Sequence, residues 1–122
     1  MPEPITLVTV PQFERNLFQH AGTDKSFRVT VRNLDGVTPT NVTGWAISFT
    51  LHAYGDPNIT YFTLTVGSGV TISNGPAGEV TIAITTTNIT NFSPNLYNWI
   101  LERTDSGNDF IIGKGSWSLL AR

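Results

Sequence analysis

The side chains that could carry chemistry in this chain of 122 residues are few and scattered. The two histidines, His20 and His52, fall beside a predicted loop and at a predicted strand end, and no acid–base dyad is evident around them. We expect both to be ordinary structural or surface residues. The chain has no cysteine, which excludes disulfides, thiol nucleophiles and zinc sites built on thiolate.

Two serines are flanked by glycines, in the runs 67–69 (Gly-Ser-Gly) and 113–116 (Gly-Lys-Gly-Ser). Neither run has the strand-to-helix elbow and oxyanion hole that acyl transfer needs. The second run also lacks the upstream glycine and the helical context of a phosphate-binding loop. We therefore interpret these glycines as turn or bulge positions.

A calcium site could be assembled from Asp105, Asn108 and Asp109, whose hard oxygen ligands lie close together in the sequence. The ordered spacing and the distal bidentate glutamate of a helix-loop-helix calcium site are absent, which favours a plain polar hairpin. We therefore expect no catalytic, cofactor or metal site, and predict that the chain is not an enzyme.

Charge and hydropathy exclude two classes of partner. Nine acidic and seven basic residues give a net charge of -2, with no run of either sign to attract nucleic acid. No apolar run approaches membrane-spanning length, and the first six residues lack the basic stretch and apolar core of a secretory signal. These features predict a protein made and kept in a cytoplasm, without nucleic-acid or membrane contact.

The elements that would position any site are strands. Apolar residues alternate with polar ones in the segments 27–32 and 45–51, and Asp35-Gly36 between them supplies turn chemistry, so two consecutive antiparallel strands are expected. Further strands are predicted over 5–10, 58–66, 70–72, 79–85, 97–101 and 110–120. The segment 12–21 fits a short helical stripe or an irregular arm equally well.

Short strands separated by Gly, Asn, Asp and Pro clusters are typical of a β-sandwich with hairpin and Greek-key connections. We predict an all-β, immunoglobulin-like sandwich of seven or eight antiparallel strands over 22–122, preceded by an arm and first strand over 1–21; an up-and-down barrel is the alternative. The candidate core residues are those on the more apolar strand faces: Phe27, Val29, Val31, Trp45, Ile47, Phe49, Leu51, Val80, Ile82, Ile84, Tyr97, Trp99, Leu101, Trp117 and Leu119.

Residues 22–120 resemble the small β-sandwich modules of phage virions, such as the amino-terminal domain of baseplate upper proteins and related capsid or tail accessory domains. The resemblance is carried by Gly22-Thr23-Asp24, Leu34-Asp35-Gly36, Val42-Thr43-Gly44, Val70-Thr71-Ile72, Gly75-Pro76-Ala77-Gly78, Val80 to Ile84, Asn95-Leu96-Tyr97-Asn98-Trp99 and Gly113 to Leu119. The family opening usually has Asp-Thr after the glycine, whereas this chain has Thr-Asp. The resemblance implies a bacteriophage virion structural protein, assembled in the host cytoplasm, that binds other virion proteins in capsid decoration or at a tail or baseplate.

The leading arm is more apolar than a solvated tail tolerates, so we expect it to be docked. It would pack on its own sandwich or pair with an open sheet edge of another chain. Its candidate interface residues are Ile5, Leu7, Val8, Val10, Phe13, Leu17 and Phe18. A symmetric homo-oligomer, a trimer or another cyclic assembly, is expected for a virion component.

The aromatic residues decide between this hypothesis and its alternatives. Trp45, Trp99 and Trp117 all fall on strongly apolar strand faces and are expected to fill the space between two sheets. A carbohydrate-binding module would instead need aromatic rings on the solvent face, for which Tyr54, Tyr61 and Phe92 are the candidates for glycan contact. A generic immunoglobulin-like adhesion domain is the remaining alternative.

Overall fold

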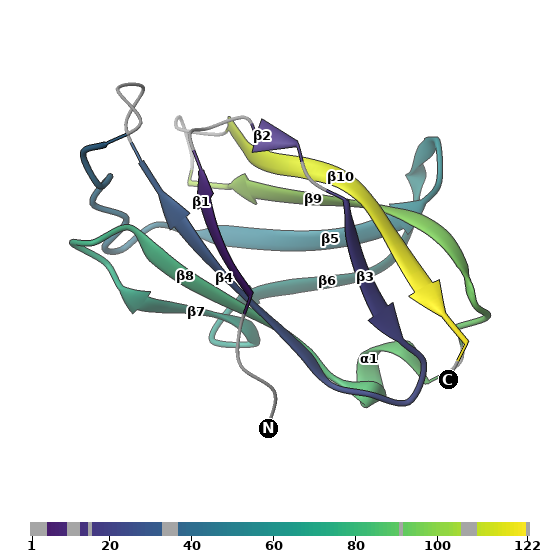
Figure 1. Cartoon of the computed structure of the whole chain (residues 1–122). Helices are drawn as coiled ribbons and strands as arrows, with labels where there is room; N and C mark the ends of the chain where they lie inside the picture. The colour runs from purple at the N-terminus through teal and green to yellow at the C-terminus, as the bar shows by residue number, and fades with distance from the viewer. Residues whose placement is uncertain are drawn as a thin grey trace.

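Ten strands and one helical turn follow one another in the computed structural model, which describes residues 5–9, 13–14, 16–32, 37–90, 92–105 and 110–121 (Figure 1). The elements are β1 (Ile5–Thr9), β2 (Phe13–Glu14), β3 (Leu17–His20), β4 (Lys25–Val31), β5 (Ile47–Ala53), β6 (Asp56–Val66), β7 (Gly69–Asn74), β8 (Glu79–Ile84), α1 (Thr86–Ile89), β9 (Asn95–Arg103) and β10 (Phe110–Leu120). The all-β class expected from the sequence is confirmed.

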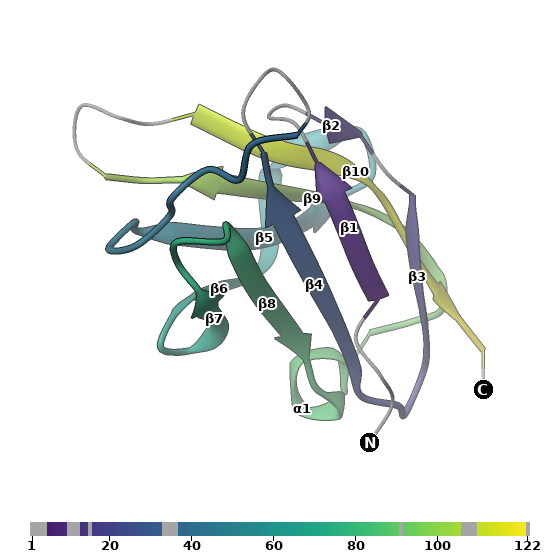
Figure 2. The same cartoon turned by 60° about the vertical axis from the view of Figure 1, so that its left-hand side comes forward.

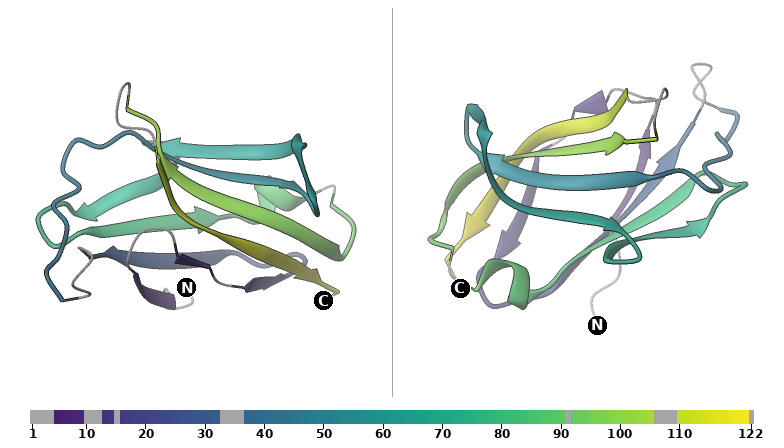
Figure 3. Two further views of the ribbon diagram at one scale, coloured as in Figure 1. Left: turned by 90° about the horizontal axis from the view of Figure 1, so that it is seen from above. Right: turned by 180° about the vertical axis from the view of Figure 1, so that it is seen from behind.

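The strands form one continuous sheet that folds over into two layers, which lie face to face (Figures 2 and 3). The first layer has the order β1-β4-β8-β7, and the second has the order β6-β5-β9-β10, with β2 and β3 both beside β10. Only two residue pairs join the layers along one side, Thr65 with Gly69 and Val66 with Val70. The fold is therefore a sandwich that is nearly closed in the manner of a barrel.

The pairing differs from the sequence expectation in two respects. β4 pairs with β1 and β8, whereas β5 pairs with β6 and β9, so these consecutive strands lie in different layers and form no hairpin. The expectation rests on a short turn, but the connection is longer and buries Val42 completely on its way between the layers. In addition, four of the pairings are parallel, namely β1 with β4, β6 with β7, and β10 with β2 and β3.

The core lies between the two layers and is built from the inward side chains of both. All the candidate core residues except Trp45 are buried there. Trp45 precedes β5 and is half-buried: it packs against the edge of the core and lies under the Arg103 guanidinium, whose carbon is 4.2 Å from the centre of its ring. Further buried apolar residues come from positions that the alternation did not single out: Leu17, Val42, Leu64, Val70, Ile89 and Ile112.

A bulge near the start of β10 explains why Ile112 is buried. The register with β9 shifts between Ile111 and Gly113, so Ile112 is completely buried, whereas Ile111 is half-buried. Simple alternation places Ile111 on the same face as Trp117, and the extra residue of the bulge reverses that assignment.

Gly78 allows the turn between β7 and β8 to pack against the end of β4 and the segment that follows it. Its φ is +73°, and a Cβ there would clash with the carbonyl oxygen of Val31 and would lie 2.8 Å from that of Thr40. The same glycine accepts a backbone hydrogen bond of 2.8 Å from the Val31 N–H. A side chain at this position would therefore strain the backbone and separate these groups.

We predict that Gly78→Ala lowers the free energy of unfolding by roughly 2 kcal/mol or more, since about 1–2 kcal/mol is expected for a left-handed non-glycine residue before any clash is added. Gly44→Ala is the matched control, because Gly44 has a φ of +79° but a Cβ there would meet nothing within 4 Å. Denaturant unfolding of both variants measures the difference. Equal losses in the two variants would contradict the assigned close approach.

Candidate interaction surfaces

The backbone of the arm pairs with both layers of its own sandwich. β1 runs parallel to β4 from the pair Ile5–Phe27 to the pair Thr9–Val31, while β2 and β3 run parallel to β10 (Figure 2). Of the candidate interface residues, the structure describes the backbone of Ile5, Leu7, Val8 and Phe13 in these strands, and Val10 lies outside the described residues. The arm thus crosses from one layer to the other.

Leu17 and Phe18 in β3 have different environments. Leu17 is buried in the core of the chain itself, whereas Phe18 on the opposite face of the strand is 47% exposed. Gln19 then points inward and is completely buried, and its amide donates hydrogen bonds to the carbonyl oxygens of Thr23 (2.7 Å) and Ile84 (3.1 Å). β3 pairs with β10 in the second layer, and Ile84 belongs to the first layer. Gln19 therefore connects β3 to the first layer as well, and this fixes the position of Phe18.

Three exposed apolar side chains gather around Ser118 on the outer face of the second layer. Ser118 is paired with Leu96 in β9 on one side and with Phe18 in β3 on the other, so these two side chains share its face. Leu120 lies two residues further along β10 and shares that face as well. Phe18, Leu96 and Leu120, which are 47%, 37% and 39% exposed, are called the outer-face patch below.

Basic side chains border the outer-face patch. The ammonium nitrogen of Lys25 lies 4.4 Å from the centre of the Phe18 ring, and the His20 ring meets that ring edge-on with centres 6.1 Å apart. These contacts orient the ring without covering it. The patch therefore presents an apolar centre with a polar rim, the arrangement found in protein–protein interfaces.

A shallow depression of about 560 Å³ lies along the same layer, between β5, β9 and β10. His52, Tyr54, Asn98, Lys114 and Ser116 are among its lining residues. The Asn98 amide accepts a hydrogen bond of 2.7 Å from the Gly55 N–H and donates one of 3.1 Å to the Gly115 carbonyl. Asn98 therefore holds the turn between β5 and β6, which carries the exposed Tyr54 side chain.

A bulge in β6 brings Tyr61 to a cluster of aromatic rings. Leu51 pairs with Phe62 and His52 with Thr60, so Tyr61 is the extra residue between them. Its ring contacts Phe92 and Tyr97 edge-on, with ring centres 5.3 and 5.2 Å apart. The Tyr97 hydroxyl donates a hydrogen bond of 2.9 Å to the Ser93 carbonyl. Its pKa is raised, mainly by burial and to a smaller extent by the neighbouring Tyr61.

The aromatic candidates for glycan contact therefore fall into two groups. Tyr61 and Phe92 come together, but they meet edge-to-face and close the end of the core, so they do not form a flat platform. Tyr54 is 61% exposed and lines the depression instead. Of these three candidates, Tyr54 is the one whose ring lines the depression.

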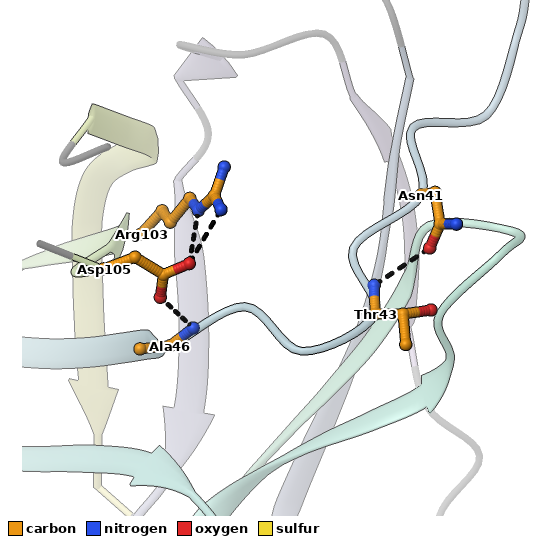
Figure 4. A network of polar contacts seen from close by, with 5 residues as sticks. All are labelled: Asn41, Thr43, Ala46, Arg103 and Asp105. Carbon is orange, nitrogen blue, oxygen red and sulfur yellow. Dashed lines mark hydrogen bonds and ion pairs between the residues drawn. The ribbon is translucent and has the colours of Figure 1, made fainter. Parts of the chain in front are cut away.

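The start of β5 is fastened to the end of β9 by an ionic network (Figure 4). Two guanidinium N–H groups of Arg103 donate to one carboxylate oxygen of Asp105, at 2.9 and 2.7 Å, and the other oxygen accepts from the Ala46 N–H. These hydrogen bonds, with that from Ala46 first in importance, lower the pKa of the Asp105 carboxyl. The Arg103 guanidinium also covers the Trp45 ring.

The candidate calcium ligands are not brought together as a described site. Asp105 uses both carboxylate oxygens in the network with Ala46 and Arg103, while Asn108 and Asp109 lie outside the described residues. Within the described ranges, no three His, Asp or Glu side chains could hold a metal ion together. No helix in the part of the chain that the structure describes is long and apolar enough to cross a membrane.

The candidate nucleophiles lie in ordinary structural positions. Ser68 is in the turn between β6 and β7, where its backbone exchanges two hydrogen bonds with Thr65. Ser116 donates its hydroxyl to the Asn16 side-chain oxygen at 2.8 Å, far from any acyl-transfer geometry. His52 is buried, with its Nδ1 3.0 Å from the Ala53 carbonyl oxygen.

Sequence reasoning named Phe18 but not its partners in the outer-face patch. Leu96 and Leu120 stand at strand ends, on the side of β9 and β10 that carries mostly polar residues, such as Asn98 and Ser118. An apolar residue on the polar face of an alternating strand is the signal that could have identified them.

Asp105→Asn should lower the melting temperature at neutral pH and should have little effect in acid. The folded-state pKa of this carboxyl is lowered, so its stabilisation is complete above the unfolded pKa of about 3.9 and is lost as the pH falls through the lower folded value. Glu102→Gln, three residues before Asp105 near the end of β9, is the control for the charge change. Thermal unfolding measured from neutral pH down into acid tests this prediction. A difference in melting temperature between Asp105→Asn and the wild type that persists in acid would contradict it.

No protein-family model and no curated protein matches the chain. Among solved structures, the N-terminal domain of phage TP901-1 ORF48 is similar, with 13% sequence identity, a TM-score of 0.49, and coverage of 97% of this chain and 95% of that chain. Murine CRIg is also similar, with 15% identity, a TM-score of 0.42, and coverage of 88% of this chain and 92% of that chain.

Proposed function

We propose that this chain is a non-catalytic structural module of a bacteriophage virion that attaches to capsid or to tail and baseplate proteins. Its role would be decoration or adaptation, and its location the assembled particle. The proposal unites two kinds of support: the sequence resemblance over 22–120, and the surfaces that the sandwich exposes.

The outer-face patch is the observation that carries the proposal. Phe18, Leu96 and Leu120 come from three neighbouring strands, and each is more than one third exposed although its strand is otherwise well packed. Large apolar side chains grouped in this way on a rigid sheet are typical of protein–protein contact. The sheet supplies a preorganised surface, so binding would cost little conformational entropy.

The polar groups of the described residues support a structural role rather than a catalytic one. Asp105, Asn98 and Ser116 are occupied with hydrogen bonds that hold turns and strands in place. Acid–base catalysis needs a titratable group within reach of a substrate atom and free to exchange its proton. The arrangement of these side chains instead serves rigidity.

Phe18→Asp should weaken binding to particles by roughly tenfold or more, since truncating or charging a central apolar contact commonly costs more than 1 kcal/mol. The measurement is co-sedimentation of the purified chain with particles of the parent phage that lack it. Val37→Asp is the control, because Val37 is 72% exposed but belongs to the segment that joins β4 to β5. Undiminished binding of Phe18→Asp, or an equal loss in the control, would contradict the proposed surface.

A carbohydrate-binding module is the second candidate, and one observation favours it. Tyr54 exposes 61% of its surface at a depression that is also lined by amide, hydroxyl and ammonium groups. Such groups bind sugar hydroxyls while an aromatic ring stacks on the sugar face. Binding on a glycan array that disappears in Tyr54→Ala and survives in Phe18→Asp would place this function ahead of the structural one.

A further inference from the structure

β6 leaves one of its two edges without a strand partner over most of its length. It pairs with β5 from Asp56 to Thr65, but with β7 only at Thr65 and Val66. In the described part of the chain, residues 56–64 therefore have a neighbouring strand on one side only (Figure 3, right). An edge of this kind presents backbone N–H and C=O groups to any strand that can approach it.

The exposure of consecutive residues shows that neither face of this part of β6 is covered. A strand packed within a sheet exposes every second side chain at most, because successive side chains point to opposite faces. In β6 the four residues 58–61 are all exposed, with Ile59 and Tyr61 at 48% and 46%. Solvent therefore reaches both faces of this part of the strand.

The direction of the backbone groups follows from the turn after β6. The Thr65 N–H donates to the Ser68 carbonyl and the Thr65 carbonyl accepts from the Ser68 N–H, so these groups of Thr65 point away from β5. Backbone groups repeat their direction every second residue of a strand. The N–H and C=O of Thr63 therefore also point away from β5, toward the open edge.

Charge and proline, two of the devices that usually protect an edge, are missing from the middle of β6, and the bulge at Tyr61 is the one irregularity described there. Residues 57–66 contain no charged side chain, and the only proline, Pro57, stands next to the start of the strand. The strands at the two ends of the sheet, β1, β2 and β3, are at most five residues long, whereas β6 has eleven. A long, uncharged edge rich in β-branched and aromatic residues is a site for strand addition.

We propose that β6 pairs antiparallel with β6 of a second copy of this chain, across a two-fold axis between Tyr61 and Phe62. The proposal is independent of the outer-face patch, whose residues lie on other strands. The absence of charge allows two identical edges to approach without repulsion. A two-fold interface also closes, so a dimer and not a fibre is the product.

The bulge at Tyr61 makes this pairing self-complementary. Thr63 pairs with Thr50 and Thr60 with His52, and because Thr50 and His52 share a face of β5, Thr60 and Thr63 share a face of β6. In the proposed dimer each Thr60 stands opposite Thr63 of the second copy. Cross-strand threonine pairs stabilise sheets, so this register favours a second copy over an unrelated strand.

Thr63→Lys tests the interface, because it places a charge on the open edge without removing a backbone hydrogen bond to β5. The mass of the chain is measured by light scattering over a range of concentrations. The dimer should form in the wild type and should weaken by roughly tenfold or more in Thr63→Lys. Thr87→Lys, an exposed threonine in α1, is the matched control and should dimerise as the wild type does. Unchanged thermal unfolding shows that the variants are folded.

The absence of cysteine from the chain makes a second test of the register possible. An equimolar mixture of Thr60→Cys and Thr63→Cys should form a disulfide-linked dimer under mild oxidation, whereas each variant alone should form much less, because like positions are offset along the strands. Three results would overturn the proposal. They are an unchanged dimer affinity in Thr63→Lys, a wild-type chain that is monomeric at every concentration, and equal cross-linking in the mixture and in the single variants. Particle binding that depends on Phe18 would be unaffected by these results.

Discussion

The backbone hydrogen bonds at the edges of the sheet are the constraint on which the rest of this structure depends. A single sheet that folds into two layers must find partners for its edge strands, or leave their N–H and C=O groups to water. Here one short arm serves both layers, with β1 on β4 and β3 on β10, while β6 and β7 join the other side over two residue pairs. Where this joining stops, β6 is left open.

The aromatic core supplies the rigidity that these edges need. Phe49 stacks on Trp99 with ring centres 5.8 Å apart, and the chain of ring contacts continues to the cluster around Tyr97 and Trp117. Such a core holds the second layer in one arrangement, so that side chains on its outer face keep fixed positions. The outer-face patch and the open edge of β6 are therefore two surfaces of one rigid layer.

Alternation in the sequence is sufficient to predict most of the strands. The segment 110–120 is predicted with the bounds of β10, and 79–85 nearly coincides with β8. The ambiguous segment 12–21 forms β2 and β3 because of pairing with β10, about one hundred residues away, which no local pattern can reveal. The other differences have the same origin. Trp45 lies at the margin of the core, in contact with the distant Arg103, and the bulge at Tyr61 reverses the face of that side chain. In each case long-range packing overrides the preference of the local sequence. The outer-face patch depends on such packing too, because the pairing of β3, β9 and β10 brings Phe18 to its partners.

Residue-resolved amide hydrogen exchange at low protein concentration tests this account most directly. If the arm covers both layers and β6 is open, the amides of β3 should exchange slowly, and the Thr63 amide should exchange much faster than that of Leu64, which points toward β5. Equal protection of Thr63 and Leu64 in the monomer, or exchange in β3 as fast as in an unstructured peptide, would contradict it.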